Sequence, residues 1–83
     1  MCYTVYIIYS QQLNRYYVGY TAETIKERLR KHNAKHRGFT GKNGDWTVVY
    51  TEFYAAKFEA MGREKQIKGW KSRKKIQQLI STE

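Results

Sequence analysis

Five side chains with chemically active heads are spread along the first 64 residues of this sequence. Two are phenols, one is a guanidinium, one an imidazole and one a carboxylate: Tyr6, Tyr17, Arg28, His32 and Glu64. A guanidinium can hold a phosphate and stabilise charge that develops on it. An imidazole exchanges protons near neutral pH, and a carboxylate is a ligand for magnesium. Together these groups are what a one-metal phosphodiesterase needs.

Glu64 is the sharpest of these signals because of its neighbours. On the helix expected there, Ala60, Met61 and Ile67 lie closest to it, so its carboxylate projects from the face that packs inward. An ionised carboxylate on such a face is costly unless it is paired or bound to a metal. Two interpretations stay equally open on the residues alone: a salt bridge to a basic residue such as Arg28, or a metal ligand.

A single carboxylate can be enough for a metal site. Magnesium keeps several waters and uses one or two carboxylates plus phosphate oxygens of the substrate. If Glu64 is a metal ligand, we expect one Mg²⁺ or Mn²⁺ ion, held weakly without DNA and better with it. Glu59, on the same helix, faces Arg63 four residues on and is predicted to form a solvated ion pair with it.

The two phenols are expected on one face of a sheet. A phenol is a poor base at neutral pH because its unperturbed pKa is about 10, but nearby cations would lower that pKa. The alternative for Tyr6 and Tyr17 is a packing role. Arg28 and His32 lie one helical turn apart, where His32 could contact the phosphate or shuttle a proton. Their alternatives are a solvated charge and a structural histidine.

Residue patterns predict the strands that must position these groups. Residues 3–9 are β-branched and aromatic, and residues 16–20 form a second strand, antiparallel to the first, after a polar turn. Gly19 weakens that strand and marks close approach by a ligand or another backbone. A loop with three glycines at 37–45 precedes a third strand at 46–54. Strict alternation puts Val48 and Tyr50 on the same face of it.

Three helices complete the predicted fold. The first begins after Thr24, which starts a capping box, and the second runs from about residue 55 to 68. Gly69 then can take the left-handed conformation, and the third helix runs from its N-cap Ser72 to about residue 80. The order β-β-α-β-α-α predicts an α+β fold of the α/β-sandwich kind, with a three-stranded, largely antiparallel sheet flanked by three helices.

Length and charge bound the possible functions. Eighty-three residues predict one domain, 1–83. The net charge is +9, with 16 Lys and Arg against 7 Asp and Glu, and the basic residues gather in two predicted helices. A polyanion is therefore the expected partner. The candidate phosphate contacts, which give affinity without sequence readout, are Lys26, Arg28, Lys31, Lys65, Lys68, Lys71, Arg73, Lys74 and Lys75.

Several protein classes are excluded by what the sequence lacks. Its one cysteine, Cys2, excludes an internal disulfide, and no Cys/His cluster indicates structural zinc. No stretch approaches the roughly 20 apolar residues of a spanning helix. The N-terminus lacks the basic start and apolar run of a signal peptide, and neither basic segment has a wide, aromatic-rich apolar face for a membrane surface. We expect a cytoplasmic protein that does not bind membranes.

The order and approximate spacing of these groups resemble the GIY-YIG nuclease superfamily over nearly the whole chain. Val5-Tyr6-Ile7 stands at the first signature tripeptide, with valine in place of the leading glycine, and Tyr17-Val18-Gly19 matches the second closely. Residues 60–68 resemble the helix that carries the family's metal-binding glutamate, which places that role on Glu64. Residues 68–80 resemble the ending of the small stand-alone bacterial members.

The resemblance implies a metal-dependent endonuclease that hydrolyses DNA phosphodiester bonds in repair or processing, as in the N-terminal domain of the bacterial excision-repair incision subunit. It implies Tyr17 as base or base relay with Tyr6 beside it, Arg28 on the scissile phosphate and assistance from His32. Targeting would come from substrate shape, such as branched or damaged DNA, from a protein partner, or from neither. The alternative is a basic nucleic-acid-binding module without catalysis, motivated by the valine in the first tripeptide and by the lack of any asparagine after Asn43.

Overall fold

A computed structural model describes residues 2–34 and 44–82 of the chain. In chain order its elements are β1 (Tyr3–Ser10), β2 (Arg15–Thr21), α1 (Ile25–Asn33), β3 (Trp46–Tyr54), α2 (Lys57–Gly69) and α3 (Arg73–Ser81). The predicted α+β class and element order are confirmed. Residues 37–43 of the predicted glycine-rich loop lie outside the described residues. None of the helices in the two described segments has the length and apolar character that crossing a membrane requires.

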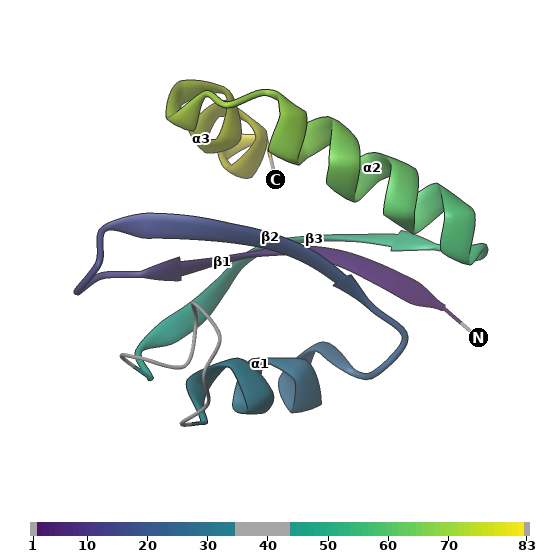
Figure 1. Cartoon of the computed structure of the whole chain (residues 1–83), viewed down its shortest axis with the longest axis horizontal. Helices are drawn as coiled ribbons and strands as arrows, with labels where there is room; N and C mark the ends of the chain where they lie inside the picture. Colours follow the sequence, from purple (N-terminus) through teal and green to yellow (C-terminus); the bar gives the residue numbers. More distant parts are fainter. Residues whose placement is uncertain (1, 35–43, 83) are drawn as a thin grey trace.

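The three strands form one antiparallel sheet in the order β2-β1-β3. Helix α1 covers one face of this sheet, and α2 with α3 cover the other (Figure 1). The central strand β1 is therefore buried on both sides, which explains why it reads as an apolar and aromatic run. Strand β2 lies at an edge of the described sheet, which matters for the site below.

Each face of the sheet carries its own hydrophobic cluster, and β1 contributes to both because successive side chains of a strand point to opposite faces. Val5 and Ile7 belong to the cluster under α2, with residues of α2 and α3 packed around them. Tyr6 and Ile8 belong to the cluster under α1, together with Trp46. All four β1 side chains are fully buried. Alternation along β1 thus divides its side chains between the two clusters.

Strand β3 departs from strict alternation. Ile7 pairs with Tyr50 but the next residue of β1, Ile8, pairs with Val48, so β3 carries one extra residue at this point. Such a bulge changes which face the following side chains occupy. Val48 accordingly packs in the α1 cluster and Tyr50 in the α2 cluster. The prediction that they share a face is wrong.

Local hydrogen bonds set the helix ends. The Thr24 hydroxyl accepts the backbone N–H of Glu27 at 3.2 Å, and the Ser72 hydroxyl accepts that of Lys75 at 3.3 Å, which confirms both predicted N-caps. The second half of the predicted capping box is not found in the described residues, because the Glu27 carboxylate accepts from Arg30 instead. Gly69 does not take the left-handed conformation; Lys71 does, with φ of 48°. Helical geometry continues through Trp70, whose ring packs against the α2 cluster, so the chain can reverse only after it.

Arg63 joins α2 to β3 rather than pairing with Glu59. Its Nε and a terminal nitrogen donate to the Glu52 carboxylate at 2.9 and 3.0 Å, while Glu59 accepts the backbone N–H of Ala56 at 3.3 Å. The predicted Glu59–Arg63 pair is wrong because β3 offers Arg63 a carboxylate that is itself mostly buried, 17% exposed. This ion pair fixes the rotation of α2 about its axis and hence the direction in which the next residue, Glu64, projects.

The Glu52 carboxylate is the centre of a small polar network. It also accepts the hydroxyls of Tyr50 and Tyr54 at 2.5 and 2.6 Å. Burial raises the pKa of Glu52, but the hydrogen bonds from Arg63 and the two tyrosines outweigh it and hold the pKa below its ordinary value. Trp70 makes a cation–π contact with this network, because the Arg63 guanidinium lies 5.6 Å from the centroid of the Trp70 ring.

Candidate active site

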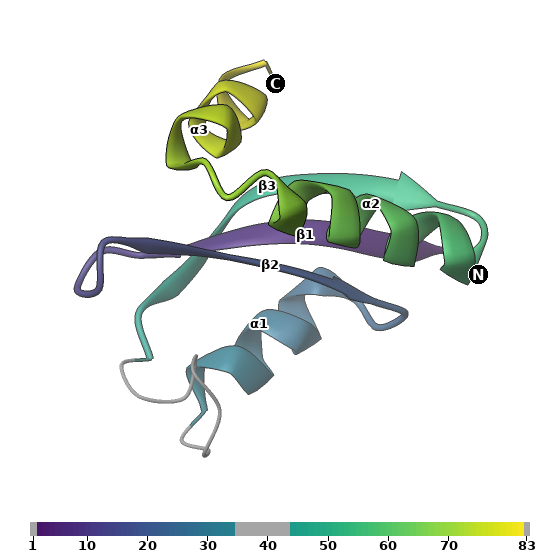
Figure 2. The same ribbon diagram turned by 45° about the horizontal axis from the view of Figure 1, so that its top comes forward.

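An open pocket of about 440 Å³ lies at the β2 edge of the sheet. Its lining comes from both strands of the hairpin, from α1 and from α2: Tyr3, Tyr6, Tyr17, Gly19, Tyr20, Ala22, Arg28, Lys57 and Glu64. Helices α1 and α2 cover opposite faces of the sheet (Figure 2), so a pocket lined by residues of both helices wraps around the edge strand. Four of the five predicted catalytic side chains are brought together here; His32 is not among the lining residues.

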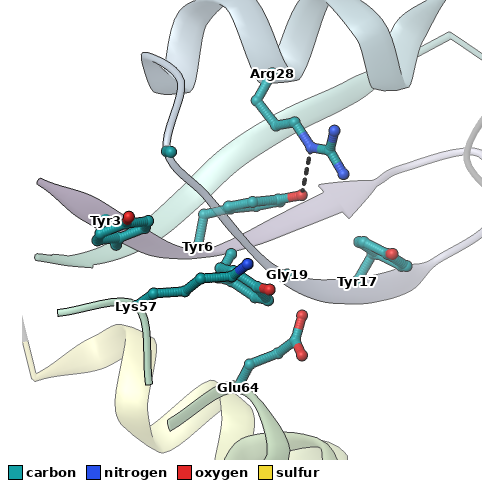
Figure 3. Close-up of a pocket in the computed structure, with 9 residues that line it drawn as sticks. Tyr3, Tyr6, Tyr17, Gly19, Arg28, Lys57 and Glu64 are labelled. Carbon is teal, nitrogen blue, oxygen red and sulfur yellow. Dashed lines mark hydrogen bonds between the residues drawn. The ribbon is translucent and has the colours of Figure 1, made fainter. Parts of the chain in front are cut away.

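Gly19 allows Tyr6 to reach this pocket. The two residues are direct partners across β1 and β2, and the Tyr6 ring lies where a side chain at position 19 would stand. A Cβ built on Gly19 would lie 2.5 Å from Tyr6 Oη and 2.7 Å from Cζ. The close neighbour predicted for this glycine is therefore a tyrosine ring, and not a ligand or another backbone. With any larger residue at position 19, the Tyr6 phenol could not extend past β2 toward Arg28 (Figure 3).

Tyr6 links α1 to the pocket through two hydrogen bonds. The Nε–H of Arg28 donates to Tyr6 Oη at 3.2 Å, and Tyr6 Oη lies 2.7 Å from His32 Nε2 in a buried contact. Arg28 can only donate, so the Tyr6 hydroxyl proton is free to point at His32 when that nitrogen is unprotonated. His32 is 7% exposed and its ring also lies 5.1 Å from that of Tyr17. The structure places His32 behind the two tyrosines.

The Tyr6 phenol is neutral at physiological pH. Burial is the largest influence and raises its pKa, the hydrogen bond and charge of Arg28 lower it, and the nearby Tyr17 and Glu64 raise it, so that the pKa lies above its ordinary value. The expected lowering of the pKa by a neighbouring cation is found for Arg28, but burial outweighs it and Tyr6 does not become a phenolate. In exchange, the hydrogen bond with Tyr6 raises the pKa of Arg28, which stays a cation. Tyr6 is built as a hydrogen-bond donor and acceptor rather than as a phenolate.

Glu64 projects from α2 into the pocket, with its carboxylate on the same side as the Tyr17 hydroxyl (Figure 3). Its ion-pair partner in the described part of the chain is Lys68, one turn along α2, at 3.6 Å. The alternative of a salt bridge to Arg28 is not found, because Arg28 instead lies 3.9 Å from Glu23. Lys68 also stands 5.4 Å over the ring of Tyr17.

The donor set around Glu64 is sparse. Within residues 2–34 and 44–82, no group of three or more His, Cys, Asp or Glu side chains could hold a metal ion. An ion at Glu64 would therefore have one carboxylate from the chain and take its other ligands from water and substrate. Magnesium accepts such a set, and the open pocket has the room for it.

Comparison with known proteins decides the family. Residues 2–77 match the family model of the GIY-YIG catalytic domain. This chain belongs to the GIY-YIG family. The fold, the two tyrosine-bearing strands and the glutamate of α2 are thereby parts of a nuclease-superfamily domain.

Two relatives of this GIY-YIG domain show how far the likeness extends. The UPF0213 protein SH2523 of Staphylococcus haemolyticus is 34% identical over 76 residues, which are 90% of each chain. The solution NMR structure of the UPF0213 protein BH0048 from Bacillus halodurans has a TM-score of 0.64 and 30% identity, covering 100% of this chain and 86% of that one. The predicted family and fold are confirmed.

The valine that replaces the first glycine of the GIY-YIG signature lies away from the site. Val5 is fully buried in the cluster under α2, on the face of β1 opposite to Tyr6. It does not line the pocket. The departure from the signature is therefore at a residue of the packed core and not at one of the pocket lining.

The predicted phosphate contacts divide into two groups. Five lysines are exposed and, within the described residues, engage in no side-chain hydrogen bond or ion pair: Lys26, Lys65, Lys71, Lys74 and Lys75. The others are already partnered. Lys31 pairs with Glu23 at 2.5 Å, and Arg73 donates to the Asn14 carbonyl at 2.6 Å while its guanidinium lies 5.2 Å from the Tyr16 ring centroid. Arg73 thus ties α3 to the β1–β2 turn.

One charged lining residue of this GIY-YIG domain was not predicted. Lys57, at the start of α2, reaches the pocket from the same helix as Glu64. A signal was available in the sequence, because Lys57 precedes Glu64 by seven residues, or nearly two helical turns, and so shares its face.

Proposed function

We propose that this protein is a divalent-metal-dependent endonuclease that hydrolyses phosphodiester bonds in DNA, in repair or processing. The observation that carries the proposal is the convergence of Tyr6, Tyr17, Arg28 and Glu64 on one open pocket. Membership of a nuclease superfamily supports it. The pocket combines a cation for phosphate, a carboxylate for a metal and a phenol beside that carboxylate, which are three requirements of the reaction.

Glu64 is the residue that would hold the metal, Mg²⁺ or Mn²⁺. Its side chain is 18% exposed and opens into the pocket, and a weak pair with Lys68 is its only competing ion pair within the described residues. When bound, the ion would polarise a phosphoryl oxygen and neutralise charge on the phosphate. One carboxylate gives weak affinity, so substrate phosphate oxygens would strengthen binding.

The chain's own residues would position the phosphate and move the proton. Arg28 uses Nε for Tyr6, which leaves its two terminal nitrogens to donate to phosphate oxygens. Tyr17, on the Glu64 side of the pocket, would act as base or base relay: as a phenolate it takes the proton of the attacking water, and as a phenol it takes that proton while giving its own to water in the open pocket. Tyr6 stays neutral and fixes Arg28. His32 acts through Tyr6 and is a positioning residue in this scheme.

The positive charge of the protein supports a nucleic acid as the substrate. The basic helices, α1 on one face of the sheet and α2 with α3 on the other, lie on opposite sides (Figure 1), and residues of α1 and α2 line the pocket at the β2 edge. Backbone contacts of exposed lysines give affinity that falls with salt and reads no sequence. We therefore propose DNA of particular shape, such as branched or damaged DNA, as the substrate in the cytoplasm, with targeting by that shape or by a protein partner.

Plasmid nicking with Mg²⁺ or Mn²⁺ tests the proposal. Glu64→Gln removes the charge of the carboxylate at nearly constant shape and is expected to lower the rate by at least about 100-fold. Glu59→Gln is the matched control, because Glu59 is an exposed carboxylate of the same helix outside the pocket. Equal trace activity in wild type and Glu64→Gln would refute nuclease activity. Salt-sensitive DNA binding that ignores metal would then favour the non-catalytic binding module.

A further inference from the structure

We propose that Lys57 is a second phosphate-binding residue of the pocket and acts opposite Arg28 across the edge strand. The inference rests on the proposed function only in that the natural ligand is taken to be a phosphodiester. It assigns to Lys57 the binding of a non-bridging phosphate oxygen. The argument uses the placement of the side chain, its lack of other partners and the charges around it.

The placement follows from the helix. Lys57 and Glu64 are seven residues apart, which is about 10 Å along the axis and nearly the same face of α2. The stem of Lys57 lies along the pocket wall, and its ammonium points into the space that Arg28, Tyr17 and Glu64 surround (Figure 3). A long lysine stem can lie on apolar surface while its head stays in water.

Lys57 combines two properties: it lines the pocket, and it has no carboxylate partner within the described residues. Lys31 pairs with Glu23, Lys68 with Glu64, and Arg63 with Glu52. For the Lys57 ammonium, the described segments contain no hydrogen bond or ion pair. A cation that lines a pocket and is not neutralised there is available to an anionic ligand.

The two cations enter the pocket from opposite faces of the sheet. Arg28 comes from α1 and Lys57 from α2, while Gly19 of the edge strand between them presents no side chain. A phosphate held by both would lie across the edge of β2, beside Tyr17 and Glu64. Arg28 has a fixed fork and sets the orientation, whereas a lysine ammonium is a compact charge that accepts several oxygen positions. The pair can thus fix the phosphate without requiring a particular base.

Titration with inorganic phosphate, without metal or DNA, tests this role. Binding would be followed by the NMR shift of the Gly19 amide in the wild type, Lys57→Gln, Lys57→Arg and Lys65→Gln. Lys65 is the matched control, an exposed lysine of α2 outside the pocket. We expect affinity to fall about tenfold in Lys57→Gln, in keeping with one lost charge-assisted hydrogen bond. Lys57→Arg should retain most of it, and Lys65→Gln should match the wild type.

Equal affinity in the wild type and Lys57→Gln, or no shift of Gly19 in the wild type, would overturn the inference. Its failure is distinct from failure of the proposed function. Lys57-dependent phosphate binding in a protein without Glu64-dependent nicking would leave the phosphate site standing and remove the nuclease. Glu64-dependent nicking with phosphate affinity indifferent to Lys57 would do the reverse.

Discussion

Adding one methyl group at position 19 should disable the pocket. In Gly19→Ala the new Cβ would stand 2.7 Å from Tyr6 Cζ and 2.5 Å from its Oη. Carbon atoms in contact lie about 3.5–4 Å apart, so the ring must retreat by roughly 1 Å. The ring has little freedom to move, because the Tyr6 side chain is fully buried and hydrogen-bonded to both Arg28 and His32.

The cost can be estimated in stability and in rate. Overpacking a filled site costs about 1–3 kcal/mol, and replacing a strand glycine by alanine returns roughly 0.5–1 kcal/mol. We expect Gly19→Ala to lose about 1–2 kcal/mol, or roughly 5–15 °C in Tm for a chain of this size. A 1 Å displacement of Tyr6 and Arg28 should lower DNA nicking by up to about 100-fold.

Thermal unfolding, the NMR signals of the His32 ring and plasmid nicking would measure these effects. Gly62→Ala is the control, because nothing lies within 4 Å of a Cβ built there on α2. That change should raise stability by about 0.5–1 kcal/mol and leave nicking unaltered. If Gly19→Ala keeps wild-type Tm and an unshifted His32 ring, the Tyr6 ring is not confined as described and the account of the second signature glycine fails.

Three further outcomes follow from the Glu52 network. Arg63→Met should lower the free energy of unfolding by about 2–4 kcal/mol, because it leaves a mostly buried carboxylate unpaired. Urea unfolding of the double variant with Glu52→Gln should show at least half of this loss recovered. If nothing is recovered, the packing of the Arg63 side chain is what stabilises the protein. Because the pKa of Glu52 is held below its ordinary value, its contribution is complete above about pH 4.5 and is lost as pH falls through the folded-state pKa, so Glu52→Gln should flatten the acid limb of a plot of Tm against pH. At alkaline pH the sign reverses. Burial and the Glu52 hydrogen bond raise the pKa of Tyr50 to about 12, so its contribution is present below pH 10 and lost as pH rises toward 12; an ultraviolet titration in which the folded Tyr50→Phe variant loses no late-titrating phenol would contradict this.

Local patterns carried much of the fold. The apolar and aromatic run of β1, the Thr24 and Ser72 caps and the order of elements are properties of near neighbours in the chain, and the structure confirms them. The same reasoning placed Tyr6 and Tyr17 on one face of the hairpin. It also predicted that Glu64 lies on the face of α2 that packs inward, because helical spacing alone decides which residues lie on the same face of a helix.

Other features depended on how distant segments meet. A bulge set the faces of Val48 and Tyr50, and a carboxylate on β3 drew Arg63 away from Glu59. Burial decided that Tyr6 is a neutral phenol, although its cationic neighbour Arg28 was visible in the sequence. These outcomes turn on long-range pairing and on depth below the surface, and neither is encoded in residue spacing.

The sequence by itself determined the kinds of chemical group, the elements that carry them and the family. Only the tertiary structure decided that the site wraps around an edge strand, with α1 and α2 supplying it from opposite faces. It alone placed His32 behind Tyr6 and Lys57 inside the pocket. The physical reason is that backbone periodicity fixes directions within one element, whereas side chains from different elements converge only where packing sets their relative position.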